Sequence, residues 1–273
     1  MTGRAGRPRL VATDLDGTLV RSDGTVSEFT REVLAGLERR GVPVVIVTAR
    51  PIRWMDDLWP MVGGHGRVIV SNGAAVVDLA GDGSITVRDV QGIEPTAGLR
   101  LVEAVRAVAP EASYAVECVG GLVRDPRYVE TDGFPAGSAV GDLAEIWAEP
   151  ALKLLVRHPD PATADGEDFR RRVFEAVADA ALPTWTVNGL VEISATGVTK
   201  ATALARVAEE LGVPPAHAVA FGDMPNDLPM LRWAGTSYAM GNGHPDLLAA
   251  ADHVAPTNDE DGVARVLAGL FAE

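Results

Sequence analysis

Two carboxylates stand two positions apart near the start of the chain, in the run Asp14-Leu15-Asp16-Gly17-Thr18-Leu19. In an extended backbone such side chains project the same way, and the glycine allows the chain to turn directly after them. Like charges this close are costly unless a cation lies between them, so the pair indicates a metal site. Hard oxygen ligands with no Cys or His nearby favour Mg²⁺ over zinc. Considered alone, the pair is explained about equally well as an acidic turn that caps a helix.

A second acidic run, Gly222-Asp223-Met224-Pro225-Asn226-Asp227, also follows an apolar segment and offers the further carboxylates that a Mg²⁺ site would use. Its alternative explanation is a Gly-Asp turn in which Asn226 or Asp227 caps the following helix, and both explanations can hold together. A third acidic run, Asp259-Glu260-Asp261, is typical of a solvated turn, and we expect no role for it.

A threonine and a lysine stand at two further element boundaries. Thr48-Ala49-Arg50 ends the most hydrophobic segment, and the Thr48 hydroxyl is suited to donate to a phosphoryl oxygen, although a threonine there more often caps a helix. Lys200 opens a predicted helix after Gly197-Val198-Thr199, and a cation at a helix N-terminus suits an anion. Taken singly, a lysine is more often a solvated surface residue.

The elements that must position these residues alternate between strand and helix. Continuous apolar runs, each ending in a polar residue, predict strands buried on both faces of a parallel sheet: Leu10–Asp14, Val42–Thr48, Arg67–Asn72 and Ala216–Asp223. Amphipathic patterns predict helices over Glu28–Arg40, with Ser27 as N-cap, and over Lys200–Leu211. This alternation predicts a doubly wound, Rossmann-like α/β core, in which ligands bind at the carboxyl ends of the strands.

The pattern changes in the middle of the chain, which predicts an inserted α+β domain over residues 82–188. The catalytic core would then be discontinuous and comprise residues 1–81 and 189–273, with Gly81, Gly83 and Gly189 as hinge candidates. The inserted domain would act as a cap that excludes water. Between Asn72 and Lys200 the expected strands and helices lie near Ile85–Val90, Thr96–Val108, Ser113–Cys118, Leu152–His158, Phe169–Ala180, Thr184–Val187 and Leu190–Ile193.

Composition limits the classes of partner. The 273 residues carry 24 Lys and Arg against 38 Asp and Glu, a formal charge of −14, which repels nucleic acid and anionic lipid at long range. No stretch approaches the roughly 20 apolar residues of a membrane span. Cys118 is the single cysteine, which fits a reducing cytoplasm. The basic start, Met1–Arg9, lacks the apolar segment of an export signal, and we expect a short disordered arm there.

In chain order, the acidic pair, the threonine, the lysine and the second acidic run resemble the four motifs of the haloacid dehalogenase superfamily. The resemblance covers both parts of the predicted core, whereas the inserted region matches only in position and length. Ala49 stands where Cof-like (class IIB) members usually have Gly, and Gly243 where they usually have Ala. Further runs that resemble the Cof-like branch are Ser71–Ala74, Val198–Leu204, Ala239–Asn242 and Ala251–Val263.

The resemblance implies a role for each motif residue. Asp14 would attack phosphorus and become a transient aspartyl-phosphate, and Asp16 would protonate the leaving oxygen and then deprotonate the hydrolytic water. Asp14, the Asp16 backbone carbonyl and Asp223 would hold Mg²⁺. Thr48 and Lys200 would bind the transferring phosphoryl group.

Other residues are implied around these. Asn226 and Asp227 would orient Lys200 or metal-bound water. For Asn72 and Gly73, contact with the leaving group and an ordinary strand-to-loop turn are equally supported. In the inserted domain, Arg124, Arg127 and Lys153 are either cations for a second anionic group or scattered surface charges. The whole substrate-binding set is Thr48, Ala49, Arg50, Asn72, Gly73, Lys200 and Asn226.

The function expected from the sequence is Mg²⁺-dependent hydrolysis of a small phosphorylated metabolite, such as a sugar phosphate, by a monomer or small homo-oligomer. One alternative is a phosphomutase or phosphotransferase, which would use the same aspartyl-phosphate. Another is a phosphate- and metal-binding protein without turnover, although Asp14, Asp16 and Lys200 are all present. A dinucleotide-dependent oxidoreductase is disfavoured, because no G-x-G-x-x-G opens the first helix.

Overall fold

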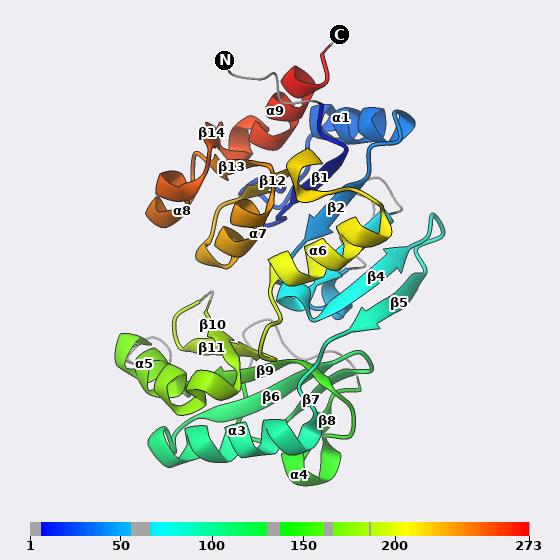
Figure 1. Cartoon of the computed structure of the whole chain (residues 1–273). Helices are drawn as coiled ribbons and strands as arrows, with labels where there is room; N and C mark the ends of the chain where they lie inside the picture. Colours follow the sequence, from blue (N-terminus) through cyan, green and yellow to red (C-terminus); the bar gives the residue numbers. More distant parts are fainter. Residues whose placement is uncertain (1–6, 56–65, 130–136, 161–165, 186, 273) are drawn as a thin grey trace. The chain divides into compact units, whose positions relative to one another are not determined.

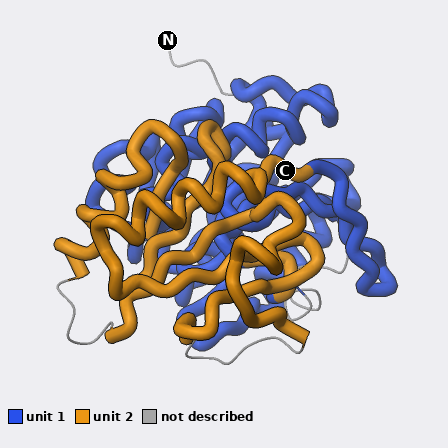
Figure 2. The backbone as a smooth tube through the Cα atoms, turned by 90° about the horizontal axis from the view of Figure 1, so that it is seen from below, with its two compact units in different colours: residues 1–50, 54–89, 199–273 blue, residues 51–53, 90–198 orange. Residues whose placement is uncertain are grey.

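The computed structural model describes residues 7–55, 66–129, 137–160, 166–185 and 187–272, so most of the expected N-terminal arm lies outside the described residues. The chain divides into two units, shown in different colours in Figure 2. The larger unit comprises residues 1–50, 54–89 and 199–273, and the smaller comprises residues 51–53 and 90–198. Each contains its own sheet and its own buried core, and each is described by itself.

The larger unit is built on a sheet that has eight strands within the described ranges (Figure 1). In spatial order the strands are β14 (His253–Ala255), β13 (Thr236–Met240), β12 (Ala218–Gly222), β1 (Leu10–Thr13), β2 (Val44–Val47), β3 (Gly66–Val70), β4 (Ala75–Leu79) and β5 (Ile85–Val90). Neighbours from β14 to β3 are parallel, whereas β4 is antiparallel to β3. The carboxyl ends of β1, β2, β3 and β12 therefore share one edge of the sheet.

The central strands are buried on both faces, which explains their continuous apolar sequence. Leu10 and Ala12 of β1 pack in a cluster with residues of three helices in the C-terminal part of the chain, residues 200–250. Val11 points to the opposite face of the sheet, and all three side chains are fully buried. Ser27 caps the first helix, as predicted, and its side chain accepts from the Thr30 N–H. Among the described residues of this unit, the α-helices are α1 (Glu28–Arg39), α6 (Lys200–Glu210), α7 (Leu228–Trp233), α8 (Pro245–Ala250) and α9 (Gly262–Leu270).

The smaller unit has a mainly antiparallel sheet, with six strands in the described part of the chain. The strand order is β10 (Leu182–Thr184), β11 (Leu190–Ser194), β9 (Ala151–Arg157), β6 (Ser113–Cys118), β7 (Gly121–Arg124) and β8 (Ala139–Val140). In the described ranges of this unit the α-helices are α3 (Pro95–Val108), α4 (Leu143–Ile146) and α5 (Gly166–Val177). One face of the sheet is covered by α3 and α5, whose Val102, Val105, Phe169 and Val173 are buried against it.

The predicted fold class, a doubly wound α/β core with an inserted α+β region, is confirmed by these topologies. Two strands lie in a different sheet from the one that the predicted boundaries imply. β5 pairs within the sheet of the larger unit, and β11 pairs within the sheet of the smaller unit. Gly81 and Gly83 are not between units, because they lie in the tight turn that joins β4 to β5, where the Gly83 N–H donates to the Ala80 carbonyl. No helix in the described ranges combines the length and apolar character needed to cross a bilayer.

Candidate active site

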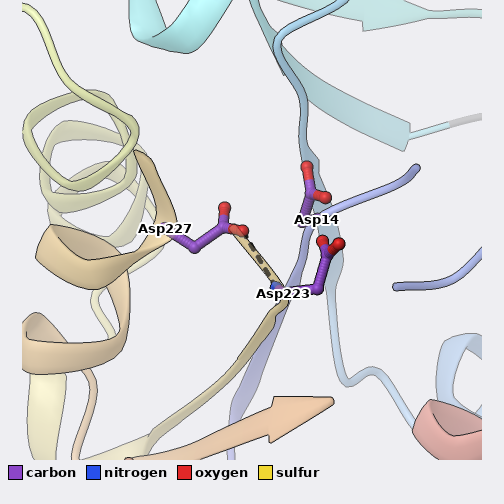
Figure 3. A group of neighbouring side chains, drawn as sticks. All are labelled: Asp14, Asp223 and Asp227. Carbon is purple, nitrogen blue, oxygen red and sulfur yellow. Dashed lines mark hydrogen bonds between the residues drawn. The ribbon is translucent and has the colours of Figure 1, made fainter. Parts of the chain in front are cut away.

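Three carboxylates meet at the carboxyl edge of the larger sheet (Figure 3). Asp14 directly follows β1, Asp223 directly follows β12, and Asp227 ends the short helix η5 (Pro225–Asp227). Because β1 and β12 are parallel neighbours, their ends bring together residues from opposite ends of the sequence. Each of the three offers a carboxylate oxygen within 4.8 Å of the others, and all three side chains are buried.

Lys200 lies between two of these carboxylates. Its Nζ donates to Asp14 Oδ1 at 2.5 Å and to Asp227 Oδ1 at 2.6 Å, and its side chain is only 1% exposed. Lys200 is the first residue of α6, whose start is fixed by reciprocal hydrogen bonds between Thr199 and Thr202. A surface location, the alternative that the sequence left open for this lysine, is therefore wrong.

Burial and charge act together on the ionisation of this cluster. Burial raises the pKa of Asp14 well above its ordinary value, and Asp227 and Asp223 raise it further, while the Lys200 ammonium opposes the rise. Burial alone would lower the pKa of Lys200, but Asp14 and Asp227 outweigh it, so the net shift is upward. Burial, followed by the Asp227 charge, raises the pKa of Asp223 to about 6. Excess negative charge is therefore costly here, and a bound cation would offset it.

The donors present fit a hard cation such as Mg²⁺. Asp227 already uses both carboxylate oxygens, since Oδ1 accepts from Lys200 and Oδ2 accepts from the backbone N–H groups of Asp223 and Met224 at 3.1 Å each. Asp14 and Asp223 are thus the better ligands, and both offer oxygen. Gly17 lies directly beside them: it has a φ of +75°, and a Cβ there would lie 2.4 Å from Asp223 Oδ2.

Asp16 lies at the same edge but is held by a different partner. Its side chain is 55% exposed and forms a two-point ion pair with Arg50, whose Nε donates to Oδ2 at 2.8 Å and whose Nη2 donates to Oδ1 at 2.5 Å. Arg50 follows β2, the neighbour of β1, so the two residues face each other across adjacent strand ends. In this structure the predicted acid/base and one predicted substrate-binding residue are bound to each other.

The loop after β2 carries two more predicted residues. Thr48 is buried, and its hydroxyl accepts from the Arg50 N–H at 3.0 Å, as in the capping turn that the sequence also allowed. A hydroxyl that accepts one hydrogen bond can still donate its own proton to a ligand. Ala49 does not adopt a positive φ, so its replacement of Gly introduces no backbone strain.

The turn after β3 places Asn72 and Gly73 against the start of α6. Asn72 is buried with a φ of +58°, and its Oδ1 accepts from Asn226 Nδ2 at 3.1 Å. Its Nδ2 is buried and has no hydrogen-bond partner in the described part of the chain. A left-handed Asn with an orphan donor is costly, and such strain is concentrated at functional sites. The turn that the sequence allowed is therefore present, and its orphan donor is suited to meet a ligand.

Sequence reasoning missed several residues around Asp16. The Thr18 hydroxyl donates to Asp223 Oδ1 at 2.9 Å. Asp261, expected in a solvated turn, instead forms a two-point ion pair with Arg21, and its side chain is only 11% exposed. That expectation was wrong because the pairing joins residues 240 positions apart, which no local pattern reveals.

The three cations considered in the inserted region differ from one another. Lys153 is buried, and its Nζ donates to Glu192 Oε1 at 2.7 Å, so it is not a scattered surface charge. Arg124 donates to the Tyr128 carbonyl, and Arg127 donates to the carbonyl oxygens of two residues that precede β6.

Comparison with known proteins adds an independent line of evidence. The family model described as haloacid dehalogenase-like hydrolase matches residues 11–267. The 5-amino-6-(5-phospho-D-ribitylamino)uracil phosphatase YitU of Bacillus subtilis is 33% identical, over 97% of this chain and 98% of its own. The family match spans both units and all of the site residues described above.

Solved structures show the same fold. The structure of SMU.1108c from Streptococcus mutans has a TM-score of 0.83 and 23% identity, covering 97% of this chain and 100% of its own. The subclass IIB sugar phosphatase BT4131 has a TM-score of 0.76 and 20% identity, covering 96% of this chain and 99% of its own.

Proposed function

This chain belongs to the haloacid dehalogenase-like hydrolases, and from that premise we propose that it is a Mg²⁺-dependent phosphatase of small phosphate monoesters. The observation that carries the proposal is the buried Lys200 ammonium, bound to both Asp14 and Asp227 at the carboxyl edge of the sheet. A buried cation and a buried carboxylate in contact are suited to bind a phosphoryl group and to attack it.

Asp14, Asp223 and the backbone carbonyl of Asp16 would hold the metal ion. When bound, Mg²⁺ would offset the negative charge of the phosphoryl oxygens and of the carboxylates around them. The oxygen-only donor set and the raised pKa of Asp223 support this assignment. Asp227 would position the site without binding the metal ion, because its two carboxylate oxygens accept hydrogen bonds from Lys200 and from the backbone of Asp223.

The reaction would proceed in two displacements. In the first, an Asp14 carboxylate oxygen forms a bond to phosphorus, the ester P–O bond breaks, and Asp16 gives its proton to the departing oxygen. In the second, Asp16 takes a proton from water, the water oxygen bonds to phosphorus, and the acyl-phosphate bond breaks. The products are the alcohol and phosphate, and Asp14 is regenerated.

Three other groups would bind the phosphoryl oxygens during these steps. Lys200 would supply positive charge, while the Thr48 hydroxyl and the Asn72 amide would donate hydrogen bonds. The buried, unpartnered Nδ2 of Asn72 supports its assignment, because a ligand oxygen would satisfy it. Asn226 would keep the Asn72 amide oriented through the bond to its Oδ1.

The proposed substrate is the phosphate ester of a small polyhydroxylated alcohol. Support comes from the relative YitU, whose name gives a phosphorylated ribityl compound as its substrate, and from the similarity in fold to a sugar phosphatase. Arg50, which already binds a carboxylate in a two-point contact, is suited to contact the leaving group at the mouth of the site. We expect no nucleic-acid substrate for so acidic a chain.

The test is phosphate release from a panel of sugar, sugar-alcohol and nucleoside phosphates, measured with Mg²⁺ and after its removal by EDTA. We expect turnover that requires Mg²⁺ and that Asp14→Asn abolishes, because an amide is a poor nucleophile. Asp252→Asn is the control at a carboxylate outside the site, since Asp252 accepts its two hydrogen bonds from Ser237 of β13, the strand next to the edge strand β14. Phosphate release by Asp14→Asn at the wild-type rate would refute the assigned nucleophile.

A further inference from the structure

The loop that directly follows Asp16, residues 17–22, is held in place by residues 242–261 near the C-terminal end of the core. We name this part the C-terminal clamp. It contributes Asn242, which follows β13, Asn258 and Asp259 of the short helix η6 (Asn258–Glu260), and Asp261 at the start of α9. Both the loop and the clamp belong to the larger unit.

Two asparagines of the clamp hold the backbone of the loop. Asn242 Nδ2 donates to the Gly17 carbonyl at 2.8 Å, and Asn242 Oδ1 accepts from the Asn258 N–H at 3.0 Å. The buried Asn258 side chain then donates through Nδ2 to the Val20 carbonyl at 2.9 Å. The two amides thus form one connected chain of hydrogen bonds to the loop.

Two aspartates hold the next two residues of the loop. Asp259 accepts from both the backbone N–H and the hydroxyl of Ser22, at 2.8 and 2.9 Å. Asp261 pairs with Arg21 through contacts of 3.0 and 2.7 Å. Asp261 has a backbone φ of +58°, which a residue other than glycine adopts only at a cost, so surrounding contacts must maintain it.

We propose that the C-terminal clamp is a positioning element for Asp16, which rests on the proposed function of Asp16 as acid and base. Four clamp residues bind positions 17, 20, 21 and 22, whereas the Asp16 side chain is more than half exposed and is held by Arg50. The clamp therefore restrains the chain directly after Asp16, and with it the position from which the acid/base side chain extends.

The chemistry makes this position demanding. A proton donor must lie within hydrogen-bond reach of the ester oxygen, and displacements of about 1 Å can cost roughly 100-fold in rate. The backbone N–H groups of Leu19 and Val20 donate to the Leu15 carbonyl and fix the first turn of the loop, but Gly17 has a positive φ and no side chain that could anchor the start of the loop. Long-range hydrogen bonds supply the restraint that the glycine lacks.

Asp259 and Asp252 offer a matched pair of variants. Both are exposed, and each accepts from the backbone N–H and the hydroxyl of one serine, Ser22 in the loop or Ser237 in β13. We expect Asp259→Ala to lower kcat about tenfold on an alkyl phosphate, which needs a proton donor, and less on p-nitrophenyl phosphate, which does not. Asp252→Ala should leave the ratio of the two rates unchanged.

A second readout does not depend on turnover. Hydrogen–deuterium exchange of the segment 17–22 should accelerate in Asp259→Ala and stay at the wild-type rate in Asp252→Ala. Unchanged exchange together with an unchanged ratio of the two rates would overturn the proposed clamp. If the wild-type chain released no phosphate from any ester, the proposed function would fail, while faster exchange in Asp259→Ala would still establish the restraint on the loop.

Discussion

Lys200 places a positive charge between the buried carboxylates of Asp14 and Asp227, and its loss would leave them close together without compensation. We expect Lys200→Met to lower the free energy of unfolding by about 3–5 kcal/mol and to abolish phosphate release. Lys153→Met is the matched control, because it breaks a buried pair with Glu192 in the smaller unit. It should be similarly destabilising but should leave a folded enzyme with turnover.

Urea unfolding and a phosphate-release assay on both variants measure these effects. Equal turnover in the two variants would contradict the role proposed for Lys200, since both remove a buried ammonium and differ only in where it lies.

At the scale of residues, the sequence identified the chemical types but not all of their partners. Asp14, Asp223 and Lys200 stand at element boundaries that a local pattern reveals, and the structure brings them together. The ion pairs of Asp16 with Arg50 and of Asp261 with Arg21 join distant segments, and nothing in either segment's own sequence indicates the partner. Such pairings depend on the register of whole elements.

At the scale of elements, the turn after β3 and the start of α6 are in direct contact. Gly73 has a φ of +105°, and a Cβ there would lie 2.3 Å from the Thr199 carbonyl oxygen, next to Lys200. We expect Gly73→Ala to lower the free energy of unfolding by several kcal/mol. The Thr199 carbonyl would have to move, and the alanine would also have a strained positive φ. Residual folded protein should show reduced turnover, since Lys200 would shift.

Gly41→Ala is the control for this prediction, because Gly41 also has a positive φ, of +68°, but has open space around its Cβ position. It should cost only about 1 kcal/mol, the strain of a left-handed alanine. Equal melting temperatures for the two variants would show that the contact with Thr199 is unimportant.

Continuous apolar runs predicted the central strands and amphipathic patterns predicted the long helices, whereas the edge strands of both sheets were less predictable. β5 has an alternating, half-exposed pattern that suits an edge strand of either sheet, so sequence alone did not assign it correctly. The glycines before β5 suit a tight turn as well as a hinge, because both require the same backbone freedom, and the structure shows the turn.

At the scale of the whole molecule, the two units suggest a test of where the inserted domain begins and ends. We propose that a chain in which a short flexible linker replaces residues 91–197 folds and retains turnover on p-nitrophenyl phosphate. That deletion keeps the eight-stranded sheet intact together with all of the candidate catalytic residues. Circular dichroism and the phosphate-release assay would measure the outcome.

The control is a deletion of residues 82–188, the boundaries expected from the sequence. It removes β5 from the larger sheet and leaves β11 without β9 and β10, its neighbours in the smaller sheet. We expect that protein to aggregate, because both changes expose apolar strand surface. Comparable solubility of the two shortened chains would contradict the assignment of β5 and β11.

Lysine occurs at just two positions in the whole sequence, 153 and 200, and both side chains are almost completely buried and bound to carboxylates. The remaining 22 of the 24 basic residues, 24 minus 2, are arginines, whose guanidinium groups do not react with the acylating esters used to label amines. The native fold therefore shields every lysine amine from such reagents. Acylation at position 153 would report the opening of the smaller unit and acylation at position 200 that of the larger, so mass spectrometry could follow the two events in one sample.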